Sequence, residues 1–81
     1  MRVTVRLFAR LRDLADAGEL HADVPAGATI ADVWRDVAAH VPAIAPFERV
    51  VSAARNADYA RMATPVAEGD EIAFLPPVSG G

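Results

Sequence analysis

The chain has 81 residues, enough for one folded domain but not for a second hydrophobic core. Hydrophobic residues make up 53% of the chain, and its net charge of −3 argues against nucleic-acid binding, which depends on neutralising phosphates. No apolar run approaches the ~18 residues of a membrane-spanning helix, and the charged, β-branched N-terminus does not resemble a signal peptide. We therefore expect a cytoplasmic protein with neither nucleic acid nor membrane as a partner.

The absence of some residue types and the clustering of others limit the kinds of site that the chain can form. The absence of cysteine excludes a disulfide framework, a thiolate nucleophile and a cysteine-based zinc site. All the basic residues are arginine, and half of them lie within the first twelve positions. Such a cluster is either a solvated surface or a docking patch, and the charge pattern alone favours the solvated surface. The clustered residues are Arg2, Arg6, Arg10 and Arg12.

The first quarter of the chain predicts a strand, a short helix and a second strand. Over residues 2–8 aliphatic residues alternate with polar ones, and Phe8 is an unexpected aromatic at the end of the outward row. Helical spacing over residues 11–15 predicts a short helix that ends near Gly18. Residues 19–24 alternate again and predict a second strand.

The clearest predicted element is a helix that begins after Thr29. Thr29 and Asp32 form a capping signal, and the apolar residues behind them recur at helical spacing until Pro42 ends the run. Trp34 lies on this apolar stripe, so we expect it in the core and not at a ligand site. The stripe consists of Ile30, Val33, Trp34, Val37, Ala38 and Val41.

The second half of the chain predicts three strands. Strands over residues 50–55 and 59–62 flank a turn at 56–58, and a turn at 68–70 leads into a final strand over 71–75. The acidic residues at this last turn are expected to be solvated, and these are Glu68, Asp70 and Glu71. The helix needs an apolar face to pack against, which the sheet provides.

The order of elements predicts an α+β fold, a ubiquitin-like β-grasp roll. We expect a mixed sheet of about five strands packed on one main helix, with a second short helix. Residues 1–77 would form this domain, and residues 78–81 a flexible C-terminal tail, because Pro76 and Pro77 cannot donate the hydrogen bonds that extend a sheet.

The tail ends in Gly80 and Gly81, which have no side chain to pack. Such a pair is either a frayed end or a thin strip of backbone suited to entering a narrow slot on another protein. Four extended residues span roughly 13 Å, enough to reach a buried site. A terminal carboxylate is ionised at neutral pH and needs activation, for which adenylation by ATP is the usual route.

Three segments resemble the molybdopterin synthase small subunits, which are sulfur carriers of the MoaD/ThiS family. The most specific likeness lies in residues 68–81, EGDEIAFLPPVSGG. Residues 7–15, LFARLRDLA, resemble the first strand and helix of this family, and residues 53–56, AARN, resemble the segment before its hairpin turn.

The resemblance implies a cycle of sulfur transfer. A ubiquitin-activating-like adenylyltransferase would use ATP to adenylate Gly81, a persulfide would convert Gly81 to a thiocarboxylate, and Gly80 would ease passage of the tail. The sulfur would then pass to cyclic pyranopterin monophosphate in the large subunit of molybdopterin synthase, within a heterotetramer of two small and two large subunits. The chain would not be an enzyme on its own, and it would bind no permanent cofactor and no metal.

The resemblance also implies docking through an exposed apolar patch. The matching residues are Phe8, Tyr59 and Leu75, and Arg12 would pair with an acidic residue of the large subunit. Alternation independently predicts that Phe8 and Leu75 lie on the outward face of neighbouring strands. Tyr59 departs from the aliphatic residue expected there, and its hydroxyl group requires water or a polar partner.

Several alternatives remain open at this point. Carriers of sulfur for thiazole synthesis, cysteine synthesis or tRNA thiolation would use the same chemistry at Gly81, although residues 76–81, PPVSGG, favour the molybdopterin branch. A ubiquitin-like protein modifier is a further alternative, although a chain without lysine cannot be extended on its own side chains. A plain β-grasp interaction module would need no terminal glycine. His21 and His40 have no third ligand nearby in the sequence, which argues against a metal site.

Overall fold

The computed structural model describes residues 1–77, and the predicted order of elements is confirmed within them. None of the helices in this part of the chain is both long and apolar enough to span a membrane. The elements are β1 (Arg2–Leu7), α1 (Ala9–Ala15), β2 (Glu19–Asp23), α2 (Ile30–His40), the 3₁₀ segment η1 (Pro42–Phe47), β3 (Ser52–Arg55), β4 (Asp58–Ala60) and β5 (Glu71–Leu75).

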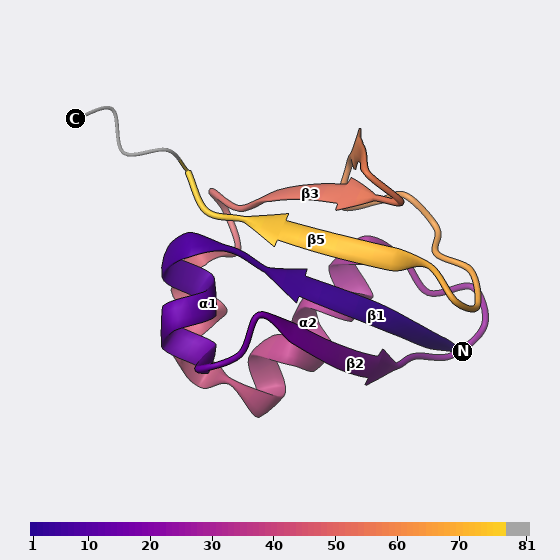
Figure 1. The fold of residues 1–81 in the computed structure, drawn as a ribbon. Coiled ribbons are helices and arrows are strands. Elements are labelled where there is room, and N and C mark those ends of the chain that lie inside the picture. The colour runs from indigo at the N-terminus through magenta and orange to yellow at the C-terminus, as the bar shows by residue number, and fades with distance from the viewer. Residues whose placement is uncertain (78–81) are drawn as a thin grey trace.

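The strands form one mixed sheet in the order β2-β1-β5-β3-β4. β1 and β5 pair in parallel at its centre, with Thr4 opposite Glu71 and Leu7 opposite Phe74, and the remaining pairs are antiparallel. Because β1 and β5 run in the same direction, the chain enters the sheet at one end and leaves β5 at the other (Figure 1).

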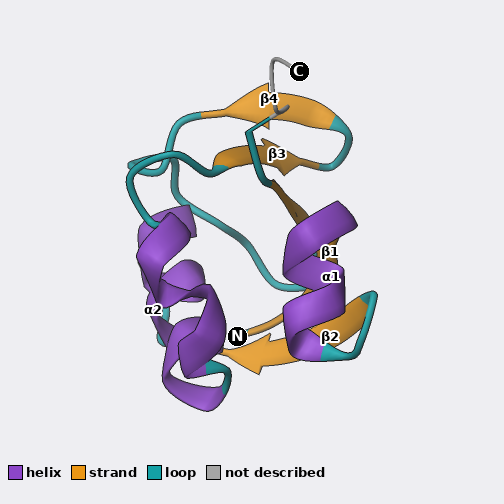
Figure 2. Cartoon of the chain, turned by 90° about the vertical axis from the view of Figure 1, so that its left-hand side faces the viewer, coloured by secondary structure: helices purple, strands orange, loops and turns teal. Residues whose placement is uncertain are grey.

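The core lies between the sheet and α2. Thr29 caps this helix as predicted: its N–H donates to Asp32 Oδ2 at 2.8 Å, and the Asp32 N–H donates to Thr29 Oγ1 at 3.4 Å. Trp34 is fully buried, as predicted, and meets Phe74 of β5 edge to face with ring centroids 4.9 Å apart. The sheet curves around α2, and α1 lies at the end of the sheet where β1 ends (Figure 2). The sheet face opposite α2 is left open.

Two strands are shorter than predicted, because nearby backbone groups have other partners. The strand expected over 50–55 begins only at Ser52, since the Val50 and Val51 N–H groups donate to the Phe47 carbonyl at 3.0 and 2.9 Å. The strand expected over 59–62 is Asp58–Ala60. Beyond it, the Met62 carbonyl accepts a hydrogen bond from the second residue of α2, Ala31, at 2.8 Å.

Candidate functional site

The open face of the sheet carries Phe8, Tyr59 and Leu75. Phe8 is 41% exposed, Tyr59 is 82% exposed, and Leu75 is half-buried. All three line one hollow of about 290 Å³, which we call the sheet-face hollow. The structure therefore brings together the three apolar residues that the sequence predicted as a docking patch. Its lining consists of Phe8, Ala54, Ala57, Tyr59, Glu71, Ala73 and Leu75.

Small side chains create the sheet-face hollow. Ala54 of β3 lies directly between Tyr59 of β4 and Ala73 of β5 in the register of the sheet. Directly opposed residues on neighbouring strands are close enough to pack. Because Ala54 and Ala73 are both small, the surface between the larger side chains is recessed. Such a recess has room for an apolar side chain of a partner.

A second hollow of about 590 Å³ lies at the end of β5, and we call it the strand-end hollow. Phe8 and Leu75 line both hollows and so lie between them. Sequence reasoning missed Arg10 and Phe47, because only the approach of η1 to α1 brings them to this place. The complete lining is Phe8, Ala9, Arg10, Phe47, Leu75, Pro76 and Pro77.

The strand-end hollow lies where the chain continues toward the predicted reactive residues. Pro76 and Pro77 follow β5 directly and form part of the hollow wall. Gly80 and Gly81, and the tail expected over 78–81, lie outside the described residues. The last described residues of the chain, Pro76 and Pro77, therefore lie beside Phe8 and Leu75.

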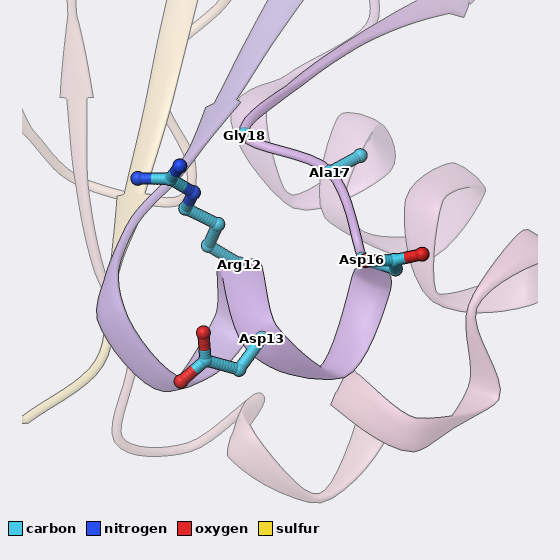
Figure 3. A pocket seen from close by; sticks show the side chains of 5 residues that line it. All are labelled: Arg12, Asp13, Asp16, Ala17 and Gly18. Atoms are coloured by element: carbon cyan, nitrogen blue, oxygen red, sulfur yellow. The ribbon is translucent and has the colours of Figure 1, made fainter.

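Arg12 does not join the apolar residues. It is exposed on α1 and lines a separate polar hollow of about 500 Å³ with Asp13, Asp16, Ala17 and Gly18. Its side chain passes close to Gly18, where a Cβ would lie 3.5 Å from Arg12 Nε. The guanidinium group and the Asp16 carboxylate point in different directions (Figure 3). Arg12 is thus accessible, but it belongs to a different part of the surface.

Asp70 corrects a prediction, because it is not solvated. It is only 7% exposed, and its carboxylate accepts hydrogen bonds from Arg55 Nε at 2.6 Å, Asn56 Nδ2 at 3.0 Å and the Ala67 N–H at 2.7 Å. Asn56 Oδ1 in turn accepts from the Glu71 N–H at 2.9 Å. The hydrogen bond from Arg55 is the main reason that the pKa of Asp70 falls to about 2. Glu68 and Glu71 are exposed, as expected.

The Asp70 network ties the β3–β4 turn to the start of β5, so we expect Asp70→Asn to destabilise the fold in a pH-dependent way. The folded-state pKa of about 2 lies below the ordinary 3.8, so ionised Asp70 contributes about 2 kcal/mol at neutral pH. This stabilisation is fully present above about pH 4 and is lost as the pH falls toward 2. Urea denaturation of both proteins between pH 7 and pH 2.5 measures it.

The matched control for this prediction is Glu71→Gln. Glu71 is exposed and lies 3.8 Å from Arg6, a distance at which a solvated ion pair contributes little. We expect this variant to stay close to the wild type at every pH. A constant difference in unfolding free energy between wild type and Asp70→Asn down to pH 2.5 would contradict the assignment.

The two histidines lie near each other but do not complete a metal site. His21 and His40 line a small hollow of about 240 Å³ together with Asp36, and His40 Nδ1 lies 2.8 Å from the Asp36 carbonyl oxygen. Within residues 1–77, no group of three or more His, Cys, Asp or Glu side chains is arranged to hold a metal ion.

The sheet order and the single main helix across it define a ubiquitin-like β-grasp protein. The crystal structure of SAMP1 from Haloferax volcanii superposes with a TM-score of 0.88 at 31% identity, covering all of both chains. The sequence model of the ThiS family matches residues 5–81. The chain therefore belongs to the ThiS family.

Relatives in this family are similar to the chain over almost its full length. The molybdopterin synthase sulfur carrier subunit of Arabidopsis thaliana is 31% identical, over all of this chain and 84% of its own length. The protein of the same name from Escherichia coli is 36% identical, over 98% of this chain and 99% of its own.

Proposed function

We propose that this chain is the sulfur-carrier subunit of a molybdopterin synthase. The observation that carries the proposal is the clustering of Phe8, Tyr59 and Leu75 in one hollow beside β5, the strand from which the chain continues to Gly81. Family membership through residue 81 supports it, as do relatives that are named sulfur carrier subunits. We also propose a cytoplasmic location, with neither nucleic acid nor membrane as a partner.

The proposed chemistry takes place at the Gly81 carboxyl group. In a partner adenylyltransferase of the ubiquitin-activating type, a carboxylate oxygen attacks the α-phosphorus of ATP and pyrophosphate leaves. The terminal sulfur of a persulfide then attacks the acyl carbon and AMP leaves. A thiol cleaves the resulting acyl disulfide, so that Gly81 is left as a thiocarboxylate and the two remaining sulfurs form a disulfide. This chain holds no permanent cofactor in the cycle, because its partner uses the ATP.

In the second half of the cycle the thiocarboxylate meets its acceptor in the large subunit. Sulfur is a softer and better nucleophile than the carboxylate oxygen, and it attacks a carbon of cyclic pyranopterin monophosphate and displaces an oxygen substituent. Water then hydrolyses the bond between the Gly81 acyl carbon and the sulfur, so that the sulfur stays on the product and Gly81 returns as a carboxylate. The large subunit supplies the catalytic side chains, so this chain is a sulfur-donating subunit and not an enzyme on its own. We propose two small and two large subunits in the assembly.

The residues of this chain bind the large subunit and orient the C-terminal tail. Phe8, Tyr59 and Leu75 bury their apolar surface against the large subunit, which holds the domain in one orientation. Residues 78–81 then reach roughly 13 Å into the partner, and Gly80 fits where a side chain would not. Arg12 pairs with an acidic residue at the edge of the contact.

The test is to load the purified chain and weigh it. With an adenylyltransferase, ATP and a sulfur source, its mass should increase by the difference between a sulfur and an oxygen atom. The same mixture without ATP should leave the mass unchanged, because the carboxylate is then not activated. A mass that stays constant in the complete mixture would count against every kind of sulfur carrier.

A protein modifier is the second candidate. A relative from Haloferax volcanii that is 33% identical is named small archaeal modifier protein 1. The structural similarity to SAMP1 from the same archaeon supports this candidate as well. In this case Gly81 would form an isopeptide bond with lysines of other proteins. Tagged protein would then produce a ladder of conjugates in cells, which a sulfur carrier would not. Co-purification with a large synthase subunit would separate the molybdopterin pathway from thiazole, cysteine or tRNA thiolation.

A further inference from the structure

In the part of the chain that the structure describes, two alanines that line the hollows have a strained backbone. Within residues 1–77, four residues other than glycine have positive φ. Asp16 and Asn56 are of types that tolerate this left-handed conformation, because their short polar side chains bond locally. Ala9, with φ of 50°, and Ala57, with φ of 75°, have no such compensation.

Ala57 lies in the turn between β3 and β4. Arg55 pairs with Asp58, so the loop contains only Asn56 and Ala57, and both have positive φ. A two-residue loop of this kind strongly prefers glycine at its second position. Alanine occupies that position here, and it lines the sheet-face hollow.

Ala9 lies at the corner between β1 and α1. Phe8 is still extended, with φ of −125° and ψ of 154°, and so continues the outward row of β1. The chain turns at Ala9, and two residues later Leu11 is fully buried. Glycine is again the residue that makes such a corner without strain. Ala9 instead contributes to the wall of the strand-end hollow.

We propose that the methyl groups of Ala9 and Ala57 are contact points for apolar side chains of the large subunit, retained at a cost in stability. The inference rests on the proposed function, because it takes the large subunit as the occupant of both hollows. Strained residues persist where function requires them, and here the strained side chains line these two hollows. Each alanine shares a hollow with Phe8 and Leu75, so a partner side chain that fills that hollow reaches the alanine as well.

The test replaces each alanine by glycine and measures two properties that should change in opposite senses. Ala9→Gly and Ala57→Gly relieve strain, so each should raise the melting temperature by about 3–6 °C. Each also removes one methyl group from the contact, so affinity for the large subunit should fall about fourfold. The double variant should lose about fifteenfold. Thermal unfolding and isothermal titration calorimetry supply the two readouts.

Ala26→Gly is the matched control. Ala26 is exposed in the turn closed by the Ala28 N–H and the Pro25 carbonyl at 3.1 Å, after β2, which is the edge strand opposite β4, and it lines neither hollow. Its backbone is not left-handed. Glycine there should lower the melting temperature, because it adds freedom to the unfolded chain, and leave the affinity unchanged.

The possible results distinguish a failure of this inference from a failure of the proposed function. If wild type binds the large subunit and the two glycine variants bind as tightly, the role of the methyl groups is overturned while the proposed function stands. If both variants melt below wild type, the strain on which the inference depends is absent, and the inference is overturned as well. Failure of the wild-type chain to bind the large subunit overturns both.

Discussion

Removing Gly81, or adding one residue after it, is expected to abolish sulfur loading. Either change moves the terminal carboxyl group by about 3.5 Å, and a displacement of even ~1 Å at a reacting atom costs on the order of a hundredfold in rate. The fold should not change, because the buried apolar residues lie between Val3 and Phe74 in the described part of the chain. Mass spectrometry of the loaded protein measures the loss.

The same truncated chain provides its own control. Its melting temperature and its affinity for the large subunit should stay near those of wild type, since Phe8, Tyr59 and Leu75 are all present. Loading of the truncated chain at the wild-type rate would show that the Gly81 carboxyl is not the site of activation. Loss of both loading and binding would show that Gly81 is required for docking as well.

Leu75→Arg is expected to have the reverse effect, leaving the last glycine intact but weakening the complex. Leu75 lines both hollows, so a partner seated there covers it. A charged group enclosed without a counter-charge costs about 3 kcal/mol or more, which is roughly a hundredfold in affinity. In the free protein the long arginine side chain reaches water from its half-buried position, so the fold should persist.

The control for this substitution adds the same charge elsewhere. Ala39 is exposed on α2, on the far side of the sheet from Tyr59, and Ala39→Arg should bind the large subunit like wild type. Calorimetric titration of both variants makes the comparison. Wild-type affinity for Leu75→Arg would remove Leu75, and with it the shared wall of the two hollows, from the proposed interface.

Local patterns predicted most of the fold. The alternation in β1 and the capping signal at Thr29 express side-chain periodicity and hydrogen bonding over a few residues, so they can be read without tertiary structure. The predicted start of β3 was wrong because the Val50 and Val51 N–H groups donate to the nearby Phe47 carbonyl and not to a neighbouring strand. The predicted end of β4 was wrong because it depends on a backbone partner far along the chain. That partner is Ala31 of α2, whose N–H group donates a hydrogen bond to the Met62 carbonyl.

The site was predictable only in part, for a similar reason. Phe8 and Leu75 stood out because each is a large apolar residue on a face that alternation marks as outward. The sheet-face hollow depends on Ala54 and Ala73, which face each other across strands, and no local sequence signal predicts such a pairing. Asp70 was misjudged because its partners, Arg55 and Asn56, are distant in sequence and come close only when β3 pairs with β5.

The central position of β5 also determines how the protein withstands force. A partner that grips the chain beyond Leu75 pulls along the strand axis. β5 is hydrogen-bonded to β1 on one side and to β3 on the other, so such a pull loads both ladders in shear and not one bond at a time. A strand at the edge of the sheet would peel away under the same tension. In the proposed function, β5 thus resists the pull of a partner that draws in the chain beyond Leu75.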